Sequence, residues 1–99
     1  MKFDHLALNV KNIHTSVRWY TENLGASVEY EDETWAMLVC GGVKIALTLE
    51  GDHPAHAAFR VNSIDDFPPG SEIKQHRDGS WYYYDRDDSG NVIEWIKYD

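Results

Sequence analysis

The sequence has one cysteine, few basic residues and no long apolar run. Cys40 is the only cysteine among the 99 residues, so the chain cannot form an internal disulfide. A single thiol agrees with a reducing compartment, and we expect a core thiol in a cytoplasmic protein. The longest stretch without a charge, residues 34–43, is far shorter than the roughly 20 apolar residues of a membrane helix, and no basic segment precedes an apolar one in the first residues given. We therefore expect no membrane association.

Positive charge is scarce. Nine Lys and Arg face 17 Asp and Glu, which gives a formal net charge of −8. Proteins that bind nucleic acid neutralise phosphates with clustered bases, so this balance argues against a nucleic-acid partner and favours a small molecule. The acidic clusters "EYEDE" at 29–33 and "DRDD" at 85–88 are typical of solvated surface.

The first half of the chain has the pattern strand, helix, three strands. Residues 3–10 are expected to form a strand, with Phe3, His5, Ala7 and Asn9 on one face and Asp4, Leu6, Leu8 and Val10 on the other. Asn12 is a candidate N-cap and Gly25 a candidate C-terminal residue for the helix between them. Three β-rich runs separated by short turns follow, at residues 27–32, 34–40 and 43–50.

The second half repeats this order with a shortened helix. A strand is expected at 56–61, and Ser63 caps a short helical turn that the residues 68–70, Pro-Pro-Gly, stop. Further strands are expected at 71–76, 80–85 and 91–98. A chain of 99 residues with 42% hydrophobic content fits one compact domain, 1–99, with module one at 1–50 and module two at 53–99.

The two halves also match residue by residue. His5, Ala7, Val10 and Ile13 correspond at one constant offset to the later set His56, Ala58, Val61 and Ile64. The strand near each module end matches too, at an offset three shorter, which makes Ala46 and Glu94 equivalent. These elements predict an α+β fold of two βαβββ modules, the second with a truncated helix.

Two imidazoles and one carboxylate are expected to converge where the first and last strands of the modules meet: those of His5, His56 and Glu94. Taken alone, a strand histidine is more often a hydrogen-bonded polar residue than a metal ligand. Glu94 taken alone is compatible with a solvent-facing position. Together they have the composition of a two-histidine, one-carboxylate site for one divalent transition metal, with Fe, Mn, Ni and Zn not distinguished. His14, His53 and His76 are expected on the surface.

The stretches "DHLALNVKNIHTSVRWYTENLG", "HAAFRV" and "DRDDSGNVIEW" resemble the vicinal oxygen chelate superfamily, which includes glyoxalase I, extradiol dioxygenases and bleomycin resistance proteins. The resemblance covers nearly the whole chain. It implies paired modules whose strands curve into a U-shaped mixed sheet around a metal, a fold often completed by homodimerisation. His5, His56 and Glu94 stand where that superfamily keeps metal ligands.

The sequence departs from the resembled pattern at Ala46, where glyoxalase I-like members carry a fourth ligand that alanine cannot supply. This argues against the glyoxalase reaction itself. Lys44 and Thr48 share the strand face of Ala46, so the three are expected to line the substrate cavity. Tyr84 is a candidate catalytic phenol, against the simpler interpretation of "WYYYD" as edge-strand packing.

The resemblance implies a metal-dependent enzyme, a dioxygenase, isomerase or lyase, that acts on a small molecule with two adjacent oxygens. The alternative is a metal-free dimer that binds a small molecule or sequesters an antibiotic, as bleomycin resistance proteins do. Four Trp and the charge of −8 suit that alternative, whereas the three ligand-type residues do not. A fosfomycin-modifying transferase also has this ligand pattern, but a phosphonate substrate favours a cationic cavity and this chain offers few bases.

Overall fold

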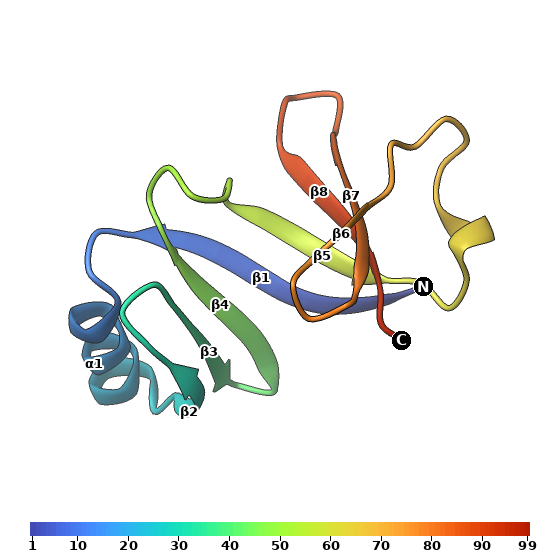
Figure 1. The fold of residues 1–99 in the computed structure, drawn as a ribbon. Coiled ribbons are helices and arrows are strands. Elements are labelled where there is room, and N and C mark those ends of the chain that lie inside the picture. The colour runs from blue at the N-terminus through green and yellow to red at the C-terminus, as the bar shows by residue number, and fades with distance from the viewer. The chain divides into compact units, whose positions relative to one another are not determined.

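The computed structural model describes all 99 residues, which form eight strands, one α-helix and one turn of 3₁₀ helix (Figure 1). In chain order these are β1 (Lys2–Val10), α1 (Ile13–Leu24), β2 (Ser27–Glu31), β3 (Trp35–Cys40), β4 (Val43–Leu49), β5 (His56–Arg60), η1 (Ile64–Asp66), β6 (Lys74–Gln75), β7 (Trp81–Arg86) and β8 (Val92–Lys97). This confirms the predicted α+β class and the order of two βαβββ modules.

The chain divides into two compact units, one of residues His5–Ala55 and the other of Met1–Asp4 with His56–Asp99. These differ from the expected modules at one point, since the start of β1 groups with the second half. Phe3 explains part of this grouping, because its ring lies edge-on to Phe59 with centroids 5.7 Å apart. The assignment of residues 1–99 to one domain stays a prediction.

In the unit His5–Ala55 the strands follow the order β2-β3-β4-β1. β1 and β4 run parallel, and the other neighbours run antiparallel. Ile13 and Val17 of α1 pack on the sheet against Leu38 and Leu47, which are completely buried. Cys40 is half-buried and packs against this cluster, so the expected core thiol lies at the edge of the core.

The helix begins and ends where the sequence predicts. The Asn12 side chain accepts a hydrogen bond from the backbone N–H of Thr15 at 2.9 Å and so satisfies one of the free donors of the first turn. At the other end Gly25 takes a left-handed conformation with φ 66°, and its N–H donates to the carbonyl of Tyr20. This conformation is strained for other residues and ends the helix.

In the second unit the strands follow the order β5-β8-β7-β6. Only β5 and β8 are parallel. The predicted truncation of the second helix is confirmed, because η1 is a single turn of three residues. A capping box closes it: Ser63 accepts from the N–H of Asp65, and the Asp66 carboxylate accepts from the N–H of Ser63.

The strand predicted at 71–76 is much shorter than expected. Only Lys74–Gln75 pair with β7. Ser71 is still part of the turn after the prolines, since its N–H donates to the Pro68 carbonyl at 3.1 Å. His76 already belongs to the hairpin that leads into β7, with its N–H donating to the carbonyl of Ser80 at 2.8 Å. Turns therefore take both ends of the predicted strand, and residues 72–73 have no regular structure.

The strand registers confirm the internal repeat. Ala7 of β1 lies opposite Ala46 of β4, and Ala58 of β5 lies opposite Glu94 of β8. Because Ala7 corresponds to Ala58 in the sequence repeat, Ala46 and Glu94 occupy equivalent positions in their own units.

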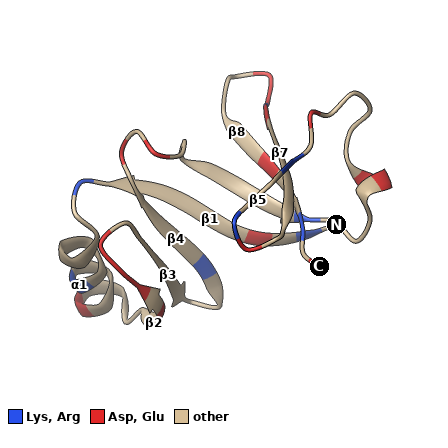
Figure 2. Cartoon of the chain, in the orientation of Figure 1, with Lys and Arg blue, Asp and Glu red and all other residues tan.

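No helix of the chain is both long and apolar enough to cross a membrane. Charged residues lie on most elements, and Figure 2 shows acidic groups on β2, on η1 and in several loops. In β8 the one acidic residue is Glu94, and in β4 the one charged residue is Lys44. The acidic residues are therefore spread over many elements, and Glu94 is the one that is buried.

The core of the unit His5–Ala55 predicts a large effect of one substitution. Leu38→Ala should lower the free energy of unfolding by about 3 kcal/mol, because it leaves a cavity among fully buried side chains. Leu24→Ala, the matched control at a side chain that is 50% exposed, should cost less than about 1 kcal/mol. Urea unfolding followed by tryptophan fluorescence measures both, and equal losses would contradict the assignment of the core.

Candidate metal centre

Glu94 is the most unusual residue of the chain, because its carboxylate lies in the middle of β8 with only 1% of the residue exposed. Moving an ionised carboxylate out of water costs several kcal/mol unless charged or hydrogen-bonding partners compensate. This burial rules out the solvent-facing interpretation. The partners of this carboxylate therefore decide what the site can do.

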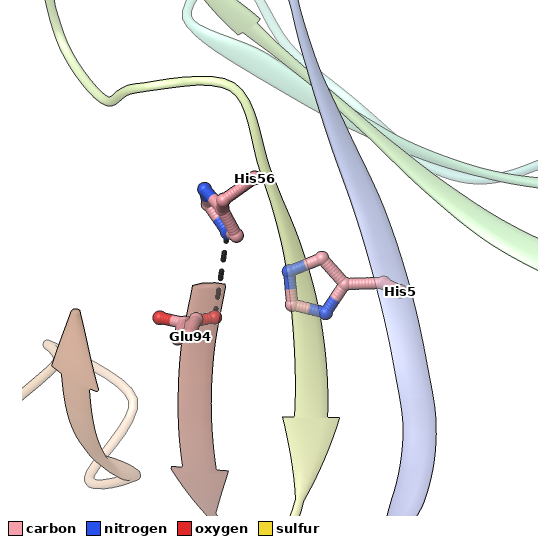
Figure 3. Close-up of side chains that lie close together, drawn as sticks. All are labelled: His5, His56 and Glu94. Carbon is pink, nitrogen blue, oxygen red and sulfur yellow. Dashed lines mark ion pairs between the residues drawn. The ribbon is translucent and has the colours of Figure 1, made fainter. Parts of the chain in front are cut away.

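His56 is the first partner of this carboxylate. It begins β5. Ala58 pairs with Glu94, and His56, two residues before Ala58, therefore lies on the same face of the sheet as Glu94. Its Nε2 lies 3.4 Å from Oε1 of Glu94, and only 7% of His56 is exposed (Figure 3). A strand histidine at this depth is held in one orientation.

The third residue of the predicted cluster is His5, which follows Asp4 in β1 and is 8% exposed. One ligand-type atom from each of His5, His56 and Glu94 lies within 4.8 Å of the other two. Figure 3 shows the His5 ring extending from β1 toward the other two side chains.

This arrangement fits a divalent transition ion in donor type and spacing. Two donors held roughly 2.1 Å from one ion lie roughly 3.0–3.4 Å apart at octahedral to tetrahedral angles. The nitrogen of His56 and the oxygen of Glu94 already have this spacing, at 3.4 Å. Two imidazoles with one carboxylate suit Fe, Mn, Ni and Zn, and three protein donors leave coordination positions for another molecule.

Tyr84 lies beside the carboxylate, directly opposite Glu94 in the antiparallel pairing of β7 with β8. Its ring is edge-on to His56, with centroids 5.1 Å apart. Burial, and then the negative charge of Glu94, raise the pKa of the Tyr84 phenol well above its ordinary value of 10.0. The hydroxyl therefore keeps its proton at neutral pH and is a hydrogen-bond donor, and the catalytic role expected for Tyr84 stays a prediction.

The expectation that His76 is a surface residue is wrong. Its Nε2 lies 3.0 Å from Oε2 of Glu94, and its ring stacks on Tyr82 with centroids 3.7 Å apart and planes 11° apart. His14 and His53 are exposed, as expected, and His14 is paired with Glu31.

The sequence carried a usable signal for His76. Asp78-Gly79 is a strong turn-forming pair, and a hairpin at this turn places residue 76 opposite residue 80. Residues 80, 82 and 84 share one strand face, which is the face of Glu94. An unbroken strand over residues 71–76 hides this signal, because it takes no account of the residue opposite His76.

The three residues expected to line a substrate cavity lie on β4. Lys44 is exposed and its Nζ lies 3.4 Å from a carboxylate oxygen of Glu29. Ala46 is 6% exposed, and the hydroxyl of Thr48 accepts a hydrogen bond from the Asn9 amide at 3.0 Å. The pairing of Lys44 with Glu29 reduces its availability for an anionic ligand. The roles of Lys44, Ala46 and Thr48 stay predictions.

Known proteins with similar sequences and folds include metal enzymes. Metallothiol transferase FosB of Staphylococcus epidermidis is 29% identical over 99 residues, covering 92% of this chain and 63% of that protein. This chain thus spans a little under two thirds of the length of that relative.

Two solved structures share the fold. Methylmalonyl-CoA epimerase from Mycobacterium tuberculosis superposes with a TM-score of 0.76 and 16% identity, over 99% of this chain and 88% of that one. The Mn(II)-bound glyoxalase from Novosphingobium aromaticivorans gives a TM-score of 0.67 and 22% identity, over 97% of this chain and 37% of that one.

A match to a family model confirms the resemblance noted in the sequence. The sequence model of the Glyoxalase/Bleomycin resistance protein/Dioxygenase superfamily matches residues 2–95, which is nearly the entire chain. The chain therefore belongs to the Glyoxalase/Bleomycin resistance protein/Dioxygenase superfamily.

Proposed function

We propose that this protein is an enzyme that depends on one divalent transition metal and acts on a small molecule with two adjacent oxygens. The observation that carries the proposal is the buried set His5, His56 and Glu94, whose ligand-type atoms lie within 4.8 Å of one another. A buried carboxylate destabilises the fold unless positive charge compensates it, and a divalent ion supplies that charge. The metal-dependent relatives support the same conclusion.

In this proposal His5 and His56 donate imidazole nitrogens to the ion and Glu94 donates one carboxylate oxygen. A divalent ion held there polarises the oxygens of a bound substrate and stabilises negative charge that develops on them. Tyr84 supplies a neutral phenol within the same cluster, and this phenol donates toward the Glu94 carboxylate, so it helps to hold that ligand.

The class of reaction is open between isomerase, lyase, dioxygenase and transferase. The transferase option, disfavoured above by the shortage of bases, gains support from the curated relatives, which are named metallothiol transferases. The fold neighbours include a methylmalonyl-CoA epimerase solved in complex with methylmalonyl-CoA, so a protein of this fold also binds a CoA ester. Ala46 supports an open coordination position in each case, since alanine cannot act as a ligand.

A metal-free binding protein is the second candidate. Stacked and edge-on rings of Tyr82, Tyr84 and His76 would suit a binder of flat or cationic molecules. Such a protein has no need for a glutamate with 1% exposure beside two histidines. The enzyme is therefore the better proposal.

The proposal predicts stoichiometric metal binding that depends on His56. Purified without chelators, the protein should hold close to one divalent transition ion per chain. Four-ligand structural zinc sites gain about 10–16 kcal/mol in all, about 3 kcal/mol per ligand, so His56→Ala should weaken binding roughly 100-fold or more. Elemental analysis and titration against a chromophoric chelator measure both quantities.

His53→Ala is the matched control for this prediction, because His53 is exposed and outside the cluster. It should bind metal as the unaltered protein does. If the unaltered protein stays metal-free after incubation with Fe(II), Mn(II), Ni(II) and Zn(II), the proposed function is wrong.

Ala46 gives a second prediction, because it occupies in its own unit the position that Glu94 occupies in the other. Ala46→Glu should add a ligand and tighten metal binding on the order of tenfold or more. The same change should weaken oxygen ligands such as catechol or a hydroxamate, because their position is filled and their negative charge is repelled. Titration of one such ligand against both proteins, each loaded with the same metal, measures the effect.

Thr48→Glu is the control for Ala46→Glu, since it adds the same charge two residues along the same strand face. It should leave metal affinity within about threefold, because side chains two positions apart in a strand are separated by roughly 7 Å. Equal metal affinities for Ala46→Glu and the unaltered protein would mean that position 46 does not face the metal.

We further propose that the protein is a homodimer. Several large apolar side chains of the unit that contains β5–β8 remain exposed, among them Phe3 at 47%, Ile64 at 40% and Tyr98 at 40%. The truncated second helix leaves this unit without the apolar cover that α1 supplies in the other. Light scattering at micromolar concentration should give twice the chain mass of 11.4 kDa. A mass that stays at one chain throughout a concentration series would refute the dimer.

A further inference from the structure

The two oxygens of the Glu94 carboxylate have different histidine partners. Oε1 lies 3.4 Å from Nε2 of His56, which belongs to the proposed ligand set. Oε2 lies 3.0 Å from Nε2 of His76, which comes from the turn between β6 and β7. The set of mutually close ligand-type atoms contains His5, His56 and Glu94 and does not contain His76. His76 therefore approaches the carboxylate from outside this set.

The contact between His76 and Glu94 is a directed hydrogen bond. When Glu94 is ionised, as a metal ligand must be, its carboxylate only accepts, and the His76 Nε2 is then the donor toward Oε2. At 3.0 Å the distance is normal for a nitrogen donor and an oxygen acceptor. The carboxylate is buried, so this bond replaces water that Glu94 has lost.

The orientation of the His76 ring is fixed by its surroundings. The ring stacks on Tyr82 with centroids 3.7 Å apart and an interplanar angle of 11°. The backbone of His76 is tied into the hairpin turn, since its N–H donates to Ser80 at 2.8 Å and its carbonyl accepts from Gly79 at 3.0 Å. The side chain remains 26% exposed, compared with 2% for Glu94, so it covers the carboxylate from the solvent side.

We propose that His76 is a positioning residue for the metal centre, which holds Oε2 of Glu94 so that Oε1 alone is presented to the metal. This proposal rests on the proposed function, since it assigns a role within that metal site. Without the bond, Glu94 keeps its contacts with His56 and Tyr84 but loses the donor at Oε2, so part of the binding free energy goes into ordering the carboxylate. Hydrogen bonds of this kind to a ligand typically change metal affinity by about 10–100-fold.

Two substitutions separate the hydrogen bond from the packing of the ring. His76→Phe keeps an aromatic ring to stack on Tyr82 and removes the donor. His76→Gln removes the ring and keeps an N–H donor at a similar reach. The probes are Mn(II), whose affinity is read from the EPR signal of the free ion, and Co(II), whose absorption spectrum reports its coordination geometry.

His76→Phe should weaken Mn(II) binding about 10–100-fold, and His76→Gln should stay within about fivefold of the unaltered protein. The Co(II) spectrum of His76→Phe should change in shape, because the carboxylate is no longer restricted to one oxygen. Circular dichroism checks that both variants fold, and His14→Ala, at an exposed histidine paired with Glu31, should match the unaltered protein.

Three results would overturn the proposal. Unchanged Mn(II) affinity and Co(II) spectrum in His76→Phe would mean that the hydrogen bond does not position Glu94. An equal loss in His76→Gln and His76→Phe would mean that the donor is not the cause. A loss as large as that of His56→Ala in both variants would identify His76 as a direct ligand.

These results are distinct from failure of the proposed function. If the unaltered protein binds neither Mn(II) nor Co(II), the metal centre itself is wrong and the role of His76 is wrong with it. If the unaltered protein binds both ions and His76→Phe binds them equally well, only the positioning role is wrong.

Discussion

Burial of the Glu94 carboxylate is the constraint on which the proposed chemistry depends. The residue is 1% exposed in a strand of apolar neighbours, where an uncompensated charge would destabilise the fold by several kcal/mol. Its surroundings supply compensation: His56 at one oxygen, His76 at the other and the phenol of Tyr84 on the neighbouring strand. A divalent ion between Oε1 and the imidazoles would complete it.

The internal repeat explains how one chain holds both a core and a site. The pairings of Ala7 with Ala46 and of Ala58 with Glu94 show the same register in both units. In one unit the helix α1 packs on the sheet and the repeat position carries alanine. In the other unit the helix is reduced to one turn and the same position carries the buried glutamate. The same strand position thus carries an alanine in one unit and a carboxylate in the other.

Much of the fold was predictable because it follows local rules. The alternation in β1, the Asn12 cap and the glycine after Leu24 each act over a few residues, and each appears in the structure as predicted. The register was predictable for a different reason, since repeated residues must take equivalent places. Strand β6 was overpredicted because propensity alone does not show that Ser71 and His76 belong to turns or that residues 72–73 pair with no strand.

The site was predictable only in part. His5, His56 and Glu94 stand out because they follow the repeat, so their proximity could be inferred from sequence. His76 has no counterpart in the repeat and reaches Glu94 through a hairpin and a ring stack on Tyr82. Such a contact depends on which residues lie opposite one another in the hairpin, and in the sequence only the Asp78-Gly79 turn indicates that pairing.

The most direct test of the account compares the thermal unfolding of the unaltered protein and of Glu94→Gln, each with a chelator and with Mn(II). A ligand that binds only the folded state stabilises it by about 2.7 kcal/mol at 100 times its dissociation constant. The account predicts that Mn(II) raises the midpoint of the unaltered protein by several degrees and leaves Glu94→Gln unchanged. An unaltered protein whose unfolding is insensitive to Mn(II), or a Glu94→Gln variant that gains as much, would contradict it.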